Sequence, residues 1–366
     1  MRDALFIGSN IYRGSSYGRL HPLSIPRVPT VMDLSRALGW LPASRYRTSP
    51  RAKPAALLGF HTPDYIRALV AAEEAQAVDA ETRRRHGLGT LSNPVFAEMY
   101  RRPATAAGGG MLAAELVAEG GVVYNPGGGT HHGHPDYANG FCYINEPVLT
   151  IQRLLAQGLG RVVYIDIDAH HCDGVEPAFH GSDQVRMISC HEEGRWPFTG
   201  QLEDDAGGAA FNLPMPRGSD DSAYRLFLDE VILPATAAFR PDAIYLQCGA
   251  DAVTEDPLSR LALSNNAHIE TVEALRPLAP RLIVSGGGGY NPWSVARLWT
   301  CIWATLSGHD IPDRLPDEAQ SILRGLSWAR KAVPTEDLLT RLRDPRREGP
   351  IPDEIRDRVA HLAARI

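Results

Sequence analysis

The chain has 366 residues, of which 44% are hydrophobic and 22% are charged, and its formal net charge is −6. This length allows one large domain or two ordinary ones with a substantial core, and the negative charge argues against nucleic-acid binding, which depends on neutralising phosphates with lysine and arginine. No stretch reaches the roughly 18 apolar residues of a membrane helix, and the apolar run at residues 4–8 is too short for a secretory signal.

The five cysteines are scattered and form no Cys-x-x-Cys pair. This spacing predicts reduced, mostly buried thiols, with neither a disulfide framework nor a thiolate metal site. Because the sequence shows no targeting segment and no membrane span, we expect a cytoplasmic protein without membrane or nucleic-acid partners.

Short apolar, β-branched runs alternate with helix-like segments along the chain. The runs are residues 121–124, 161–167, 242–247 and 281–285, and helices are expected at residues 146–157, 220–239 and 265–275. Near-continuous apolar strands separated by helices are typical of a parallel sheet covered on both faces. The sequence, which has no internal repeat, therefore predicts a single α/β domain over residues 1–366. Its core is expected at about residues 4–312, with peripheral helices and loops at 313–366.

A glycine-rich turn containing three histidines, residues 126–134, follows the first of these strands. His131 and His132 are suited to proton transfer, because an imidazole with a pKa near 6.5 exchanges protons near neutral pH. The turn could equally cradle a phosphate, but no P-loop lysine follows it, and glycine-rich turns are more often only tight backbone.

Three metal-ligating side chains alternate at the end of the second strand. Asp166, Asp168 and His170 occupy positions i, i+2 and i+4, which share one face of an extended chain. Ligands bind at the carboxyl ends of strands in open α/β sheets, and catalytic zinc takes three protein ligands and keeps one position open. Asp168 and His170 can supply two of the three ligands, and Asp251, which follows the third strand, is the candidate for the remaining one.

A tyrosine stands in a second glycine-rich loop, residues 285–292, directly after the last strand. Tyr290 could place its hydroxyl beside the metal and donate a hydrogen bond to an oxyanion. Taken alone, it could also be an ordinary half-buried tyrosine.

Taken in order, these segments resemble the histone deacetylase superfamily, which includes bacterial acetoin utilisation proteins and acetylpolyamine amidohydrolases. The resemblance runs from about Ile11 to about Pro312 and rests on residues 60–65, 87–90, 130–132, 140–145, 166–174, 249–251 and 286–291. It implies an arginase/deacetylase-like three-layer fold, in which helices flank a central, mainly parallel sheet.

The resemblance also implies roles for individual residues. Asp168, His170 and Asp251 look like ligands of one zinc ion, and Tyr290 looks like the oxyanion donor. His132 resembles the general base and acid, oriented by Asp173, and His131 resembles its electrostatic partner, oriented by Asp166. A potassium ion is expected nearby, held by Asp166, Ser189 and backbone carbonyls around Asp168 and His170. Gly140, Phe141 and Trp196 resemble walls of the substrate tunnel.

Three positions depart from the family pattern. Ser92 stands where many relatives have an aspartate that clamps the substrate backbone, which puts peptide recognition in doubt. Trp196 replaces a frequent phenylalanine and could narrow the tunnel mouth, and Cys172 replaces a frequent glycine.

The expected activity is removal of an acetyl or similar small acyl group from an amine, with acyl-lysine as the first substrate candidate. An acetylated polyamine is the nearest alternative, because the acidic residues at 192–193 and 203–205 could attract a cationic amine, although they are more often a solvated rim. A ureohydrolase would require a second metal site, and an inactive scaffold would be expected to lose a ligand or the tyrosine. Family members include monomers, dimers and tetramers, and of these states we expect a homo-oligomer.

Overall fold

The computed structural model describes residues 3–366, so the first two residues of the predicted domain lie outside the described part. Eight strands form one sheet in the order β2-β1-β3-β8-β7-β4-β5-β6, and every neighbouring pair is parallel. The strands are β1 (Leu5–Gly8), β2 (Tyr46–Thr48), β3 (Gly121–Asn125), β4 (Val162–Asp166), β5 (Val185–Glu192), β6 (Ala210–Met215), β7 (Ala243–Gln247) and β8 (Arg281–Ser285). The predicted α/β three-layer fold is confirmed.

Alternate residues of each central strand enter different hydrophobic clusters, because successive side chains of a strand point to opposite faces. In β4, Val163 and Ile165 belong to one cluster, whereas Val162 and Tyr164 belong to another. Helices α6 and α7 contact the sheet on the second of these faces, and α2, α10 and α11 pack together on the first. Burial on both faces explains why the strands read as continuous apolar runs.

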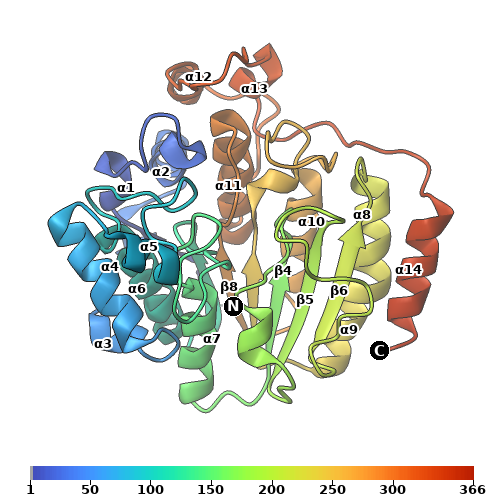
Figure 1. Ribbon diagram of the computed structural model, residues 1–366. Coiled ribbons are helices and arrows are strands. Elements are labelled where there is room, and N and C mark those ends of the chain that lie inside the picture. The colour runs from blue at the N-terminus through green and yellow to red at the C-terminus, as the bar shows by residue number, and fades with distance from the viewer. Residues whose placement is uncertain (1–2) are drawn as a thin grey trace.

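Helical segments connect and cover the strands. They are α1 (Ile11–Gly14), η1 (Pro22–Ser24), α2 (Arg27–Ala37), η2 (Ala43–Arg45), α3 (Pro54–Leu57), α4 (Pro63–Ala75), α5 (Ala80–His86), α6 (Arg101–Leu116), α7 (Glu146–Ala156), η3 (Glu176–Phe179), α8 (Asp221–Phe227), η4 (Leu228–Ile232), α9 (Leu233–Phe239), η5 (Ala250–Ala252), α10 (Asn266–Leu275), α11 (Pro292–Ser307), α12 (Asp317–Arg324), α13 (Glu336–Thr340) and α14 (Asp353–Ala363). The C-terminal α14 lies beside α8 (Figure 1), and its buried side chains Ile355, Val359 and Leu362 join the main core.

The four predicted strands appear as β3, β4, β7 and β8, within one or two residues of their expected ends. The helix expected at 220–239 is divided into α8, a single π-helical segment η4, and α9. Pro234 lies in the first turn of α9 and has no N–H for the helical ladder, so a wider π turn immediately before it accommodates the missing donor. The sequence did not reveal β1, β2, β5 and β6. The last two carry polar residues, and β6 has Pro214 at the sheet edge.

No helix within residues 3–366 is long and apolar enough to cross a membrane. All five cysteines lie in this part of the chain, and each is buried and free of a disulfide.

Candidate active site

The strand order brings the predicted chemical groups to one place. β3, β8, β7 and β4 are consecutive in the sheet and parallel, so their carboxyl ends lie at the same edge. The histidine turn follows β3, the tyrosine loop follows β8, Asp251 follows β7, and the Asp-x-Asp-x-His stretch follows β4. Segments far apart in the chain therefore meet at the position expected for a ligand site in an open α/β sheet.

Asp168, His170 and Asp251 form a buried cluster whose ligating atoms all lie within 4.8 Å of one another. His170 Nδ1 is 3.1 Å from Asp168 Oδ1 and 3.0 Å from Asp251 Oδ2, so it stands between the two carboxylates. This is the set predicted from the sequence, and its one imidazole and two carboxylates are donors that suit a divalent cation.

Hydrogen bonds to the outer oxygens fix the orientation of both carboxylates. Asp168 Oδ2 accepts from Gly288 N at 2.7 Å and from Gln247 Nε2 at 3.0 Å, and Asp251 Oδ1 accepts from Ala169 N at 2.9 Å. Sequence reasoning missed Gln247. The sequence does contain a feature that could have identified Gln247. It is a polar residue at the end of a buried apolar strand, at the same edge of the sheet as the predicted ligands.

Two glycines allow the loops to approach these carboxylates closely. A Cβ at position 249 would lie 2.0 Å from Asp168 Oδ2, and a Cβ at position 288 would lie 2.0 Å from Asp251 Oδ2. Any larger residue at either position would displace a carboxylate, so both glycines are steric requirements of the cluster.

Each histidine of the pair is held by a carboxylate, which is fully buried in Asp166 and mostly buried in Asp173. His131 Nδ1 lies 2.6 Å from Asp166 Oδ2, and His132 Nδ1 lies 2.5 Å from Asp173 Oδ1. Asp166 also accepts a hydrogen bond from the hydroxyl of Tyr164. The structure thus brings together the two Asp–His pairs that the resemblance implied. In both pairs the carboxylate contacts Nδ1, so Nε2 is the ring nitrogen that this carboxylate does not engage.

The electrostatic environment separates the two histidines. Burial opposes protonation of His131, but the carboxylates of Asp166 and Asp168 outweigh it and raise its pKa to about 9. Burial, reinforced by the neighbouring His131, lowers the pKa of His132 to about 4 despite its contact with Asp173. These opposite shifts favour protonation of His131 and the neutral form of His132.

Tyr290 is buried beside the cluster, with 7% of its surface exposed. Its backbone N–H donates to Asp256 Oδ2 at 2.7 Å, and Asp256 Oδ1 accepts from Leu258 N at 2.9 Å. The Phe141 ring meets the Tyr290 ring edge-on, 5.6 Å between centroids. Burial raises the pKa of Tyr290 well above 10, so its hydroxyl keeps its proton. Sequence reasoning missed Asp256, which lies in an irregular loop without a strand or motif to mark it.

A pocket leads from the surface to this cluster. It is lined by Ser92, His132, Gly140, Phe141, His170, Arg195, Trp196, Leu258 and Tyr290. His132, His170 and Tyr290 are buried and form its floor, whereas Ser92 and Trp196 are exposed at its mouth. The Trp196 ring lies 4.6 Å from the His132 ring, centroid to centroid, and so reaches down the wall to the floor. The three predicted tunnel residues and Ser92 line this pocket, together with Arg195 and Leu258, which were not predicted to line it.

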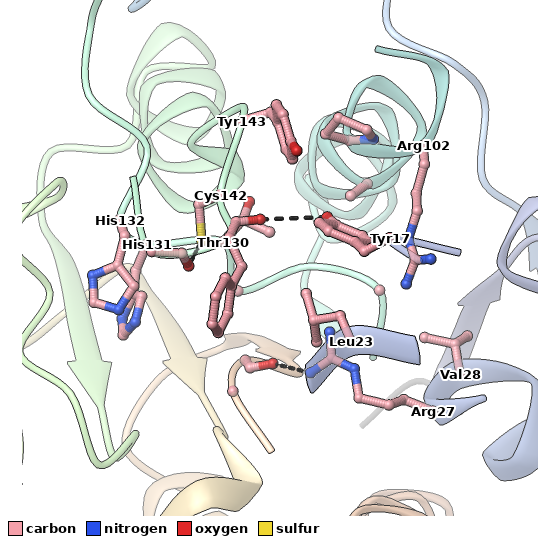
Figure 2. Close-up of a pocket in the computed structure, with 18 of the residues that line it drawn as sticks. Tyr17, Leu23, Arg27, Val28, Arg102, Thr130, His131, His132, Cys142 and Tyr143 are labelled. Carbon is pink, nitrogen blue, oxygen red and sulfur yellow. Dashed lines mark hydrogen bonds between the residues drawn. The ribbon is translucent and has the colours of Figure 1, made fainter. Parts of the chain in front are cut away.

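A second, internal cavity lies on the other side of the histidines. Figure 2 shows Arg27 and Arg102 on the side opposite to His131 and His132. Arg27 donates to the carbonyl oxygen of Gly287 at 2.6 Å, and Tyr17 donates to that of Phe141 at 3.3 Å. The side chains of Arg27 and Arg102 thus line this cavity beside the proposed reaction centre. The sequence pattern around the two arginines did not predict this position.

Two predicted residues remain, Ser189 and Cys172. Ser189 of β5 is paired in register with Asp166, and its hydroxyl lies 3.0 Å from His191 Nδ1. Cys172 is fully buried in the hydrophobic cluster on the α6–α7 face, so its thiol serves there as a small apolar group.

Comparisons with known proteins agree with this geometry. A sequence model of the histone deacetylase domain matches residues 21–306. The chain is 36% identical over 336 residues to the acetoin utilization protein AcuC of Bacillus subtilis, a match that covers 87% of this chain and 86% of that one. It is 35% identical over 309 residues to histone deacetylase 19 of Arabidopsis thaliana, covering 82% of this chain and 61% of the plant protein.

Solved structures give the same result. The structure is similar to that of a histone deacetylase homologue from Aquifex aeolicus, with a TM-score of 0.93, 36% identity, and coverage of 99% of this chain and 100% of the other. A homologue complexed with SAHA gives a TM-score of 0.94. Fold and sequence together define a hydrolase of the deacetylase class. The chain belongs to the histone deacetylase family, which excludes the ureohydrolase alternative.

Proposed function

We propose that the protein is a zinc-dependent deacylase that hydrolyses the amide of an acyl-lysine or of another acylated primary amine. The observation that carries this proposal is the placement of a buried Asp–His–Asp cluster at the floor of a pocket, between an Asp-oriented histidine and a buried tyrosine.

The residues at the floor fit a divalent cation. Asp166, Asp168 and Asp251 are all buried, and within the described residues they form ion pairs with histidines but not with lysine or arginine. Buried carboxylates are costly unless a cation compensates them. Asp168, His170 and Asp251 would hold zinc, which when bound supplies a Lewis acid for the amide carbonyl and lowers the pKa of water.

His132 would carry the proton transfers. It lines the substrate pocket, whereas His131 faces only the inner cavity. With Nδ1 held by Asp173, its Nε2 can accept a proton from the attacking water and later deliver that proton to the leaving amine. His131, held by Asp166, would contribute positive charge and remain protonated.

Tyr290 would stabilise the oxyanion. Its protonated hydroxyl is buried at the pocket floor, where a hydrogen bond to developing negative charge is strong because water is excluded. The wall formed by Gly140, Phe141 and Trp196 would hold the aliphatic chain of the substrate. The inner cavity, with Arg27 and Arg102, suits the small carboxylate that the reaction releases.

A structural potassium ion would lie next to this centre. Asp166 and Ser189 face one another across the β4–β5 pairing, and both are buried. The backbone carbonyls of Asp168 and His170 would complete a set of oxygen donors of the kind that hard cations prefer.

The test is amine release by zinc-loaded protein from a matched panel: an acetyl-lysine peptide, free acetyl-lysine, an acetylated polyamine and a neutral aryl acetamide. Tyr290→Phe should lower kcat by about 10²–10³, because one oxyanion donor is lost, while zinc content stays unchanged. Tyr46→Phe, on the edge strand β2, is the matched control and should retain full activity. Failure of zinc-loaded protein on every substrate, or full activity of Tyr290→Phe, would overturn the proposal.

A further inference from the structure

One basic side chain stands at the mouth of the substrate pocket. Among the described residues that line the pocket, Arg195 is the only lysine, arginine or acidic residue, and its carboxylate partner Glu192 is buried and does not line the pocket. We propose that Arg195 makes the mouth a recognition site for a carboxylate on the substrate. This inference rests on the proposed function and names the substrate class: an acylated amine whose aliphatic chain is attached close to a carboxylate.

Arg195 is fixed in position. Its Nε and one of its terminal nitrogens donate to the two oxygens of Glu192, each at 2.7 Å. Glu192 is only 4% exposed, and it also accepts from Arg260 N at 2.7 Å. The carboxylate therefore points inward, while 27% of the Arg195 side chain is exposed at the mouth. A bidentate pair of this kind holds the guanidinium plane rigidly.

One side of the guanidinium remains available. Within the described residues, the second terminal nitrogen of Arg195 has no hydrogen-bond partner in the protein. The exposed Arg260 adds a second cation two residues from the mouth residue Leu258. A substrate carboxylate at the mouth would therefore meet positive charge held on a preorganised side chain.

The acidic residues that could have attracted a cationic amine do not line the mouth. Glu192 is buried against Arg195, and Glu193 pairs with Arg358 at 2.7 Å. Asp204 and Asp205 accept hydrogen bonds from backbone N–H groups of their own loop. Ser92 offers no charge, and its carbonyl oxygen lies 3.1 Å from His21 Nε2. An acetylated polyamine would thus meet no carboxylate among the described residues that line the pocket.

Two sources could provide the carboxylate. One is an acidic residue beside an acyl-lysine in a peptide, and the other is the α-carboxylate of a free acyl-amino acid. Exposed charge pairs have modest energies that salt reduces. We therefore expect about a three- to ten-fold preference for acidic over neutral substrates at low ionic strength, and a smaller one in 0.5 M salt.

The experiment compares kcat/KM for three acetyl-lysine peptides that differ only in an acidic, neutral or basic residue next to the lysine. Free acetyl-lysine and its carboxamide separate the second source from the first. The same ranking is measured as Kd by fluorescence anisotropy of labelled peptides, so the charge preference is tested even without turnover. Arg195→Gln removes the charge, and Arg324→Gln, which lies on α12 and is also paired with a glutamate, is the matched control.

The expected result is the order acidic, neutral, basic in wild type and Arg324→Gln, and a flattened order in Arg195→Gln. An unchanged order in Arg195→Gln, or no dependence on charge in wild type, would overturn the inference while leaving the deacylase proposal intact. Loss of turnover on all substrates together with charge-ranked binding would overturn the deacylase proposal alone.

Discussion

Gly249→Ala should disable the metal site without touching a ligand. The added Cβ would lie 2.0 Å from Asp168 Oδ2, and ordinary contact begins at 3.4 Å, so the carboxylate must move by more than 1 Å. Zinc–ligand distances tolerate only about 0.2 Å. The bonds that Asp168 accepts from Gln247 and Gly288, each worth about 1.5–3 kcal/mol because the acceptor is charged, oppose any compensating shift. We expect zinc affinity to fall by at least about 100-fold, the upper end of what second-shell changes cost.

The assay is competition for zinc against a chelator of known affinity, with circular dichroism to establish that the variant folds. Gly14→Ala is the matched control, since an added methyl there meets no heavy atom within 4 Å. Gly288→Ala, which crowds Asp251 Oδ2 in the same way, provides a second test if Gly249→Ala does not fold. A folded Gly249→Ala protein with zinc affinity within about threefold of wild type would refute the assignment of Asp168 as a ligand.

Two further predictions concern buried groups around the site. Asp256→Ala should lower kcat by up to about 100-fold, because the backbone N–H groups of Tyr290 and Leu258 lose their shared acceptor. The zinc content should stay unchanged. An unchanged kcat would contradict this positioning role of Asp256. Burial lowers the pKa of His61 to about 4, and its Nε2 accepts from Asn145 N at 3.0 Å. The unfolded histidine titrates near pH 6.5, so unfolding takes up a proton as the pH falls from about 6.5 to 4. The free energy of unfolding should decrease over this range by up to about 1.4 kcal/mol per pH unit. Urea denaturation at several pH values should show a smaller slope for His61→Gln than for wild type, and equal slopes would contradict the prediction.

Local patterns in the sequence predicted the elements that bear the site. Apolar runs identified β3, β4, β7 and β8, because strands buried on both faces need apolar residues at successive positions. The alternation Asp166, Asp168, His170 placed three polar groups on one side of an extended chain, a relation that period-two geometry determines without tertiary information. The positions of Asp251 and Tyr290 directly after other apolar strands marked them as candidates, and the family resemblance then implied their roles.

Only the tertiary structure decided what surrounds these residues. Strand order places β8 between β3 and β7, and this order depends on how helices pack across both faces of the sheet, which residue periodicity does not encode. Gln247, Asp256 and Arg195 became part of the site through contacts of this kind. Of the acidic residues that sequence alone could assign to a rim or to an amine-binding surface, Glu192 and Glu193 pair with arginines, and Asp204 and Asp205 accept from backbone N–H groups. Their role depends on which way each side chain points, and that is determined by packing between segments distant in the chain.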